Sequence, residues 1–383
     1  MATRVSKSVR KTSQQQLAQE VHSRGLRIVL AVTGGGSEAI SALLKVPGAS
    51  RSILAAAVPY AAHAMGEWLG GPPDDFCSPR TGRAMAMASF LKAKAYDPES
   101  PTCGVACTAS LASDRPKRGQ HRAHVAWQTA TTTAAYQLEL RKGRRTREQE
   151  EAVVAALVLN AVAEATGAAS RLELPLLEGE HVVTSRVDAP ADEQDLLADR
   201  AMAIVRGADG QPPAAIFPGA FNPLHAGHRR MASVARGIVG ADVAFEIAIA
   251  NVDKPPLDYI EIDHRVRQFE SGETVWLTRA PTFVKKAELF PGARFVVGAD
   301  TIVRVGQQRY YGHEAAMRQA IESIAAAGCR FLVFGRVIDG KFCTLEDLSL
   351  PESLAAICQG VPADTFREDI SSTQLRAEQK TTA

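Results

Sequence analysis

Apolar positions along the chain follow two periods, and the alternation between them predicts α/β structure. In the first half, short apolar runs typical of buried strands occupy residues 27–32, 52–60, 103–110, 121–129 and 133–141. Apolar residues at helical spacing occupy residues 14–23, 61–69, 80–94 and 146–166, and a further helix runs to about residue 45. The pattern therefore predicts one α/β domain over residues 14–168.

The second half repeats this character over residues 213–378. Apolar runs predict strands near 214–216, 242–250, 276–278, 294–298 and 331–334, and helical patterns begin at Arg229 and His264. Residues 169–212 are rich first in acidic residues and then in Gly and Pro, which predicts a linker with one strand at 181–187. Residues 1–13 are predicted to be a basic, disordered tail, with an organelle-targeting segment as the alternative.

The composition limits the classes of function. At 383 residues the chain is long enough for two cores, and its 46% apolar and 22% charged residues are typical of a soluble globular protein. A net charge of +2 gives no electrostatic argument for nucleic acid or membranes as partners, and no apolar stretch reaches the length that spans a bilayer. The six cysteines form no disulfide or zinc-binding pattern, so we expect no protein-bound metal and a cytoplasmic location.

The strongest candidate for chemistry is the turn at residues 217–228, between a predicted strand and a predicted helix. His225 and His228 lie at the start of that helix, where free N–H groups and the helix dipole favour anions. Imidazole groups there can donate to phosphate oxygens as negative charge develops on them. Gly227 lets a phosphate approach the backbone. The alternative is a strand–turn–helix with two incidental histidines.

This turn resembles the signature of the nucleotidyltransferase superfamily, Gly-x-Phe-[Asp/Asn]-Pro-x-His-x-Gly-His. The matching residues are Gly219, Phe221, Asn222, Pro223, His225, Gly227 and His228. The superfamily includes the nicotinamide and nicotinate mononucleotide adenylyltransferases, pantetheine-phosphate adenylyltransferase and the cytidylyltransferases. The resemblance implies a Rossmann-like, mostly parallel sheet with His225 and His228 as catalytic residues. It also implies a nucleotide cradle formed by Gly219, Ala220, Phe221, Asn222 and Gly227.

A second motif lies near the end of the chain. Ser371, Ser372 and Thr373 precede a predicted helix, where hydroxyl and N–H groups form an anion site, and Arg376 follows about one turn later. The run 370–376 resembles the Ile-Ser-Ser-Thr-x-x-Arg element of the same superfamily. The resemblance implies that the hydroxyl residues bind the β- and γ-phosphates of a nucleotide and that Arg376 is catalytic. Taken alone, the Ser-Ser-Thr run is a helix cap.

Strand ends between the two motifs carry further polar residues. Because α/β folds bind ligands at the carboxyl ends of strands, Gly298, Asp300 and Arg336 are predicted to line the nucleotide site. The run 298–300 also resembles a Gly-x-Asp element of the adenylyltransferases. The predicted acceptor-binding residues are Lys254, Trp276 and Arg279. Alternatively the cations are solvated surface residues, and Trp276 is a core or oligomer contact rather than a stacking platform.

The N-terminal domain has its own candidate turn. Thr33, Gly34 and Gly35 end the first predicted strand, where such a turn can cradle a phosphate. This turn, the Val-Pro-Gly-Ala-Ser run at 46–50, Tyr60 and the basic run at 143–145 resemble the C-terminal domain of the CinA family. Active members of that family hydrolyse the amide of nicotinamide mononucleotide. The resemblance implies a pocket lined by Thr33, Gly34, Gly35, Ser37, Tyr60 and Arg145.

The chain departs from the CinA pattern where that pattern carries chemistry. Leu-Ala-Val at 30–32 replaces Glu-Ser-Cys, and Ala61, Ala62 and Met65 replace the family's Ser, Asn and Lys. One hypothesis is a degenerate domain that binds a pyridine nucleotide or mediates oligomerisation. The other is an active deamidase whose catalytic groups have shifted. The candidates for shifted groups are Ser37, Ser110, Ser113, His63 and Arg145.

Both halves thus resemble families that handle nicotinamide mononucleotide or its acid. Together the resemblances imply transfer of AMP from ATP to nicotinamide or nicotinate mononucleotide, with release of pyrophosphate, in NAD synthesis or salvage. Mg²⁺ would accompany ATP, and a homo-oligomer is expected. Two alternatives stay open: a cytidylyl- or adenylyltransferase for another phosphate acceptor, and a nucleotide-binding sensor or scaffold.

Overall fold

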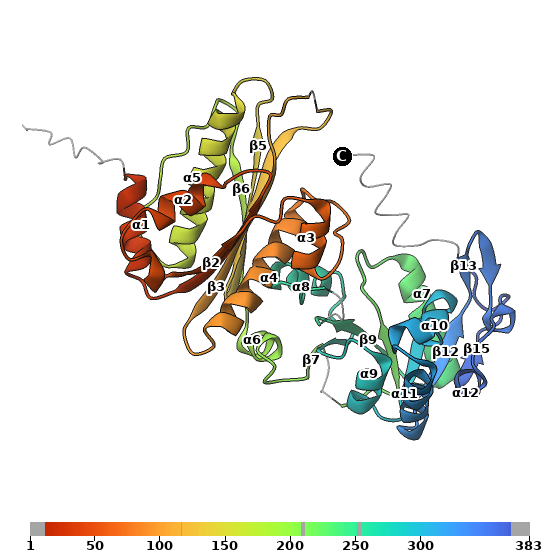
Figure 1. Cartoon of the computed structure of the whole chain (residues 1–383). Coiled ribbons are helices and arrows are strands. Elements are labelled where there is room, and N and C mark those ends of the chain that lie inside the picture. Colours follow the sequence, from red (N-terminus) through yellow and green to blue (C-terminus); the bar gives the residue numbers. More distant parts are fainter. Residues whose placement is uncertain (1–11, 116, 208–210, 251–253, 369–383) are drawn as a thin grey trace, which may run out of the picture. The chain divides into compact units, whose positions relative to one another are not determined.

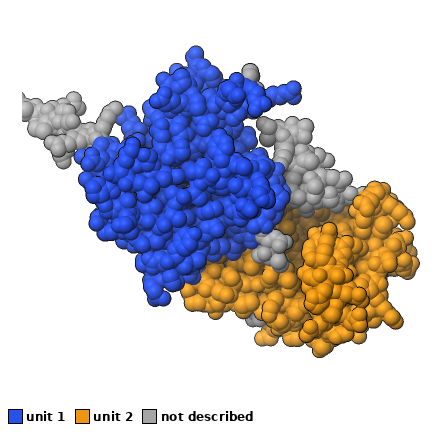
Figure 2. Space-filling model, in the orientation of Figure 1, with its two compact units in different colours: residues 1–194, 253–261 blue, residues 195–252, 262–383 orange. Residues whose placement is uncertain are grey.

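The computed structural model describes residues 12–115, 117–207, 211–250 and 254–368, and it divides the chain into two compact units (Figure 1, Figure 2). Unit 1 comprises Met1–Gln194 with Asp253–Glu261, and unit 2 comprises Asp195–Val252 with Ile262–Ala383. The chain therefore passes from one unit to the other three times. None of the helices in these residues is long and apolar enough to cross a membrane.

Unit 1 is built on a six-stranded mixed sheet with the order β2-β1-β3-β4-β5-β6. β1 (Arg27–Thr33) pairs in parallel with β2 (Ile53–Ala57) and β3 (Thr102–Ser110). The antiparallel strands are β4 (His121–Gln128), β5 (Thr132–Leu140) and β6 (Val182–Asp188). β6 confirms the strand predicted at 181–187 and shows that this part of 169–212 completes a sheet rather than connecting two domains.

Helices cover both faces of this sheet (Figure 1). One face carries α1 (Gln14–His22), α2 (Glu38–Leu44) and α5 (Arg147–Ala165), and the other carries α3 (Ala62–Leu69) and α4 (Pro79–Tyr96). A short helix, η1 (Ala49–Arg51), precedes β2. Successive residues of β1 supply both cores, because Leu30 and Val32 point to the first face and Ala31 to the second. Every helix and strand predicted within 14–168 is present, with small differences at the ends.

Unit 2 is built on a seven-stranded sheet with the order β15-β12-β11-β8-β9-β10-β7. Only β7 (Ala203–Arg206) is antiparallel to its neighbour, so the mostly parallel sheet that the sequence predicts is confirmed. The parallel strands are β8 (Ala215–Pro218), β9 (Val243–Ala248), β10 (Val275–Thr278), β11 (Arg294–Gly298), β12 (Arg330–Phe334) and β15 (Cys358–Gly360).

The connections of unit 2 are mainly helical. They comprise α7 (Ala226–Val239), α9 (Phe283–Leu289), α10 (Ala299–Val305), η2 (Gln308–Tyr310), α11 (Glu314–Ala326), η3 (Leu345–Asp347) and α12 (Glu352–Ala355), with a hairpin of β13 (Arg336–Ile338) and β14 (Lys341–Cys343). α6 (Ala191–Leu197) and α8 (Tyr259–Val266) each span a boundary between the units.

Two predicted helix starts are wrong. α7 begins at Ala226, not Arg229, because His225 has the extended conformation of an N-cap residue. α8 begins at Tyr259, and His264 lies in its last turn. The start of α8 is fixed by Asp258, whose carboxylate accepts a hydrogen bond from the Glu261 N–H at 3.0 Å.

The strand order of unit 2 reverses at β8. From β8 the chain continues to β9 and β10 on one side of the sheet, and then to β11, β12 and β15 on the other. Such a reversal leaves a crevice at the carboxyl ends of the two strands on either side of it, where α/β proteins bind ligands. In this unit those strands are β8 and β11.

Candidate functional site

The turn that follows β8 is held by aromatic packing. The Phe221 ring lies edge-on to Phe217, Phe245 and Phe269, with ring centroids 5.4–5.5 Å apart. Phe221 has a φ of +44°, and the peptide bond between Asn222 and Pro223 is cis. A Cβ at Gly219 would lie 2.5 Å from the Phe221 Cζ, so only glycine fits there. The unusual backbone of the signature thus follows from its own residues.

The two signature histidines stack at the start of α7. Their ring centroids are 3.7 Å apart, with 27° between the planes. His228 Nδ1 accepts a hydrogen bond from the His225 backbone N–H at 3.3 Å. In the neutral ring the proton is therefore on Nε2, which is the donor that His228 can offer a ligand. Burial, together with nearby His225 and Arg336, lowers the pKa of His228 to about 3, so the ring is neutral at physiological pH.

His225 carries a polar atom that the described residues leave without a partner. Its Nδ1 is buried and has no hydrogen bond to any residue that the structure describes. Burial and then Arg336 lower the pKa of His225, whereas Glu368 acts to raise it. An unpaired buried polar group costs about 1–3 kcal/mol, so a partner for this nitrogen would stabilise the site.

Two glycines leave space for the polar groups of the site. A Cβ at Gly227 would lie 3.1 Å from both the His225 Nδ1 and the Glu368 Cγ. A Cβ at Gly298, which ends β11, would lie 2.6 Å from the Asp300 Oδ1 and 2.9 Å from the Arg336 Cγ. Side chains at these two positions would therefore displace the groups that line the crevice.

Arg336 brings a cation to the histidines. It follows β12, and its Nη2 lies 3.1 Å from the sulfur of Met231 in α7. Burial lowers the pKa of its guanidinium, while Asp300 and Glu368 act to raise it. Asp300 also pairs with Arg304 at 2.7 Å, and Glu368 pairs with Arg230 at 3.6 Å. Two imidazoles, a guanidinium and a helix N-terminus at one crevice form a site suited to a phosphate group.

The structure thus groups His225, His228, Gly298, Asp300 and Arg336, all of which were singled out from the sequence. Sequence reasoning missed Glu368 and Gln268. The position of Glu368 just before the second motif was a usable signal, whereas nothing in the sequence around Gln268 marks it. Ser371, Ser372, Thr373 and Arg376 lie outside the described residues.

The predicted acceptor-binding residues are not assembled within unit 2. Lys254 is exposed and belongs to unit 1. Arg279 pairs with Asp199 at 2.8 Å and donates to the carbonyl oxygens of Leu196 and Leu197, so it anchors the end of α6. Trp276 packs edge-on against Phe290 in the core, as the alternative interpretation has it.

The candidate turn of unit 1 is filled by a carboxylate of the chain itself. Glu151, which is 9% exposed, accepts hydrogen bonds from the Gly36 N–H at 2.9 Å, the Ser37 hydroxyl at 2.9 Å and the Glu38 N–H at 3.2 Å. A Cβ at Gly34 would lie 1.9 Å from the Ala109 carbonyl oxygen. The turn expected to cradle a phosphate therefore binds an internal anion, which corrects that expectation.

The first turn of α5 closes this region further. Arg147 donates to the carbonyl oxygens of Gly34 and Ala112, at 2.9 and 3.3 Å. Glu150 accepts from the Ala112 N–H at 2.7 Å and lies 2.7 Å from the His121 Nδ1. The loops that follow β1 and β3 are thus bound to α5 rather than open to a ligand.

The other residues of the predicted N-terminal pocket differ in their surroundings. Thr33 and Gly35 are buried. Tyr60 is 68% exposed. Arg145 is buried in an ion pair of 2.7 Å with Glu180. The side chain of His63, a candidate catalytic group, is 89% exposed and pairs with Glu67 at 3.4 Å.

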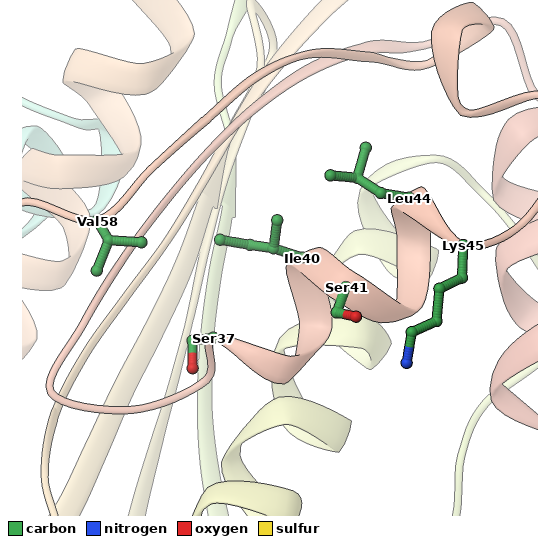
Figure 3. Close-up of a pocket in the computed structure, with 6 residues that line it drawn as sticks. All are labelled: Ser37, Ile40, Ser41, Leu44, Lys45 and Val58. Carbon is green, nitrogen blue, oxygen red and sulfur yellow. The ribbon is translucent and has the colours of Figure 1, made fainter.

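Unit 1 does contain a pocket, which shares only Ser37 with the predicted one. It has a volume of about 520 Å³ and lies between α2 and the end of β2 (Figure 3). Its lining residues are Ser37, Ile40, Ser41, Leu44, Lys45 and Val58. Among the residues that the structure describes, no group of three or more His, Cys, Asp and Glu side chains is arranged to hold a metal ion.

Unit 2 combines a mostly parallel sheet with a His-x-Gly-His turn at its topological switch point. Residues 216–378 match the family model described as cytidylyltransferase-like. Unit 2 therefore contains a cytidylyltransferase-like domain, which supports a nucleotidyltransferase in general.

Solved structures of the CinA superfamily are similar to the N-terminal part of the chain. A competence or damage-inducible protein from Enterobacter asburiae is 18% identical, with a TM-score of 0.34 over 41% of this chain and 98% of that one. CihA from Agrobacterium tumefaciens is 20% identical, with a TM-score of 0.33 over 40% and 94%. A CinA superfamily protein from Enterobacter cloacae is 18% identical, with a TM-score of 0.35 over 44% and 98%. At these scores the likeness assigns no activity to unit 1. No curated protein matches the chain.

Proposed function

We propose that the protein transfers AMP from ATP to nicotinamide or nicotinate mononucleotide, with release of pyrophosphate. The observation that carries the proposal is the group of His225, His228 and Arg336 at the switch point of unit 2, where His225 Nδ1 is buried without a partner among the described residues. The choice of acceptor rests on the sequence resemblances of both halves, and the choice of ATP on that of the C-terminal half.

The reaction needs positioning and charge stabilisation rather than a covalent intermediate. An oxygen of the acceptor phosphate would attack the α-phosphorus of ATP in line, and the bond to the bridging oxygen of the β-phosphate would break, so that pyrophosphate leaves. Negative charge then grows on the α-phosphate oxygens. His228 would donate to them through Nε2–H, and Arg336 would supply a positive charge in a partly dehydrated crevice, where electrostatic interactions are stronger than in water.

The triphosphate needs further ligands beyond this group. Ser371, Ser372, Thr373 and Arg376 would bind the β- and γ-phosphates, as the resemblance implies. Mg²⁺ would enter as part of the MgATP substrate and be held mainly by phosphate oxygens and water.

For unit 1 we favour the degenerate domain over the deamidase. Glu151 occupies the donors of its turn, the His63 side chain is exposed, and the Arg145 side chain is bound in an ion pair with Glu180. A role of unit 1 in homo-oligomer formation stays a prediction, as does the cytoplasmic location.

The experiment that tests the proposal is pyrophosphate release by the purified full chain with MgATP, comparing nicotinamide mononucleotide with nicotinate mononucleotide. Release that depends on either acceptor supports the adenylyltransferase and names its substrate. The match to a cytidylyltransferase-like family favours one second candidate, CTP with a small phosphorylated alcohol. Release in that arm alone would replace the proposal, and nucleotide binding without release in any arm would indicate a sensor.

A further inference from the structure

One side-chain amide binds both sides of the signature turn. Gln268 follows the end of α8, and its Nε2 donates to the Phe221 carbonyl oxygen at 2.9 Å. Its Oε1 accepts from the Leu224 N–H at 2.8 Å. These two hydrogen bonds bracket Asn222 and Pro223, the residues at the tip of the turn. The side-chain amide of Gln268 therefore bridges the two ends of the turn.

Gln268 is itself held from the helix that carries the histidines. Arg229, the residue after His228, donates through Nη2 to the Gln268 carbonyl oxygen at 3.1 Å. The same guanidinium pairs with both carboxylate oxygens of Glu273, at 3.0 and 3.1 Å. One network of hydrogen bonds thus connects the turn, the start of α7 and the segment after α8.

The turn needs such support. Phe221 has a φ of +44°, and the left-handed region costs a residue with a Cβ roughly 1–2 kcal/mol. His225 follows directly after Leu224, so the hydrogen bond of the Leu224 N–H orients the backbone that leads into the N-cap histidine. The side-chain amide donates to one backbone group and accepts from the other, which neither an ionised carboxylate nor an ammonium group can do, because the first only accepts and the second only donates.

We propose that Gln268 is a positioning residue for nucleotidyl transfer, which holds the 221–224 turn so that His225 and His228 meet the α-phosphate. The kinetic part of this proposal rests on the proposed function. Gln268 acts through the backbone of the turn and does not touch substrate. Its loss should lower the rate of the chemical step more than it weakens nucleotide binding, because a small misplacement of transition-state donors affects mainly kcat.

The test compares Gln268→Leu and Gln268→Glu with a control, Gln319→Leu, which makes the same change at an exposed position of α11. In both Gln268 variants kcat for pyrophosphate release should fall about 10- to 100-fold while KM for ATP changes less than about threefold. Hydrogen exchange of the segment 219–228, measured without substrate, should be faster than in the wild type. The control should match the wild type in all three quantities.

The Gln268→Glu variant gives a readout that a general loss of packing would not. A protonated carboxyl group donates and accepts as the amide does, so the activity of this variant relative to the wild type should recover as the pH falls towards the pKa of the new carboxyl group. If the Leu variant does not fold, the Glu variant carries the comparison alone.

The outcomes separate this proposal from the proposed function. Absence of pyrophosphate release by the wild type with every nucleotide would overturn the function, and hydrogen exchange would still decide whether Gln268 holds the turn. Unchanged exchange in 219–228, or an unchanged kcat in a variant whose exchange is faster, would overturn the positioning role.

Discussion

The two units each place a glycine-containing turn at the carboxyl end of a parallel strand, before a helix, and they treat its polar groups in opposite ways. In unit 1, Glu151 accepts from two N–H groups and a hydroxyl of the turn after β1. In unit 2, the turn after β8 leaves the His225 Nδ1 buried without a partner in the described residues. The first turn is filled by a carboxylate of the chain itself, whereas the second keeps a buried ring nitrogen that forms no hydrogen bond with any described residue.

The difference lies in what the rest of the fold brings to the turn. In unit 1, α5 forms hydrogen bonds with the loops after β1 and β3 through Arg147, Glu150 and Glu151. In unit 2 the neighbouring strand ends bring Arg336, a cation that has the carboxylates of Asp300 and Glu368 near it. The charges that the rest of the fold places beside the glycine-containing turn therefore differ between the two units.

The largest effect is expected from removing a donor of the open turn. His228→Ala should lower kcat for pyrophosphate release about 10²- to 10³-fold, the usual cost of one lost transition-state donor. The matched control is His63→Ala, which removes an exposed histidine of unit 1 and should leave turnover unchanged. Circular dichroism would verify that both variants fold. Equal turnover in folded His228→Ala and in the wild type would show that His228 is not a catalytic donor.

A smaller effect is expected from removing the Glu151 carboxylate from the turn after β1 of unit 1. Glu151→Ala should lower the free energy of unfolding of unit 1 by about 2–4 kcal/mol, because the donors of the turn lose a shared acceptor. Added sulfate should restore part of that stability by occupying the vacated position, and it should not do so in the wild type. Glu148→Ala, at an exposed position in the same helical turn, serves as the control. A loss below about 1 kcal/mol would mean that Glu151 does not hold the turn closed.

The smallest effect concerns the pH dependence of unit 2. Burial, then His225 and Arg336, lowers the pKa of His228 from 6.5 to about 3. Between these values the unfolded chain binds more protons than the folded one, so stability falls as the pH falls below 6.5. At pH 5 the contribution amounts to a loss of about 2 kcal/mol relative to pH 8.

This pH dependence can be measured in unit 2 alone. Urea unfolding would be followed by the fluorescence of Trp276 in a Trp68→Phe, Trp127→Phe background, because the other two tryptophans lie in unit 1. His228→Gln should flatten the acid side of the stability curve. An identical acid-side slope in the variant and its parent would show that His228 is not the neutral donor described above.

The sequence predicted most of the fold because its signals are local. Apolar runs and helical spacing located most strands of both sheets, and the signature located the histidines. The strands β7 and β15 were missed: β7 lies in the segment predicted to be a linker, and β15 has only three residues, too few to show a periodicity. The starts of α7 and α8 were misplaced because the caps, His225 and Asp258, were taken for residues of the loops.

The closure of the turn in unit 1 was not predictable in this way. Glu151 lies 115 residues after Gly36, in the first turns of a helix that is apolar along most of its remaining length. Its role appears only when the sheet brings the start of α5 to the end of β1. The ion pair of Arg279 was not predictable for the same reason, since its partner Asp199 lies in the segment predicted to be a linker.

The path of the chain between its units has a consequence for genetic exchange between the units. Arg83, 11% exposed, pairs with Asp258 at 3.0 Å and Glu261 at 2.9 Å, and the Tyr259 N–H donates to the Thr133 hydroxyl at 3.1 Å. A genetic exchange that replaced the chain after residue 207 and lost these carboxylates would leave the guanidinium buried without either of them, a loss of about 3–5 kcal/mol. The two units therefore cannot be exchanged independently by recombination, because each is encoded by two separate segments of the chain (Figure 2).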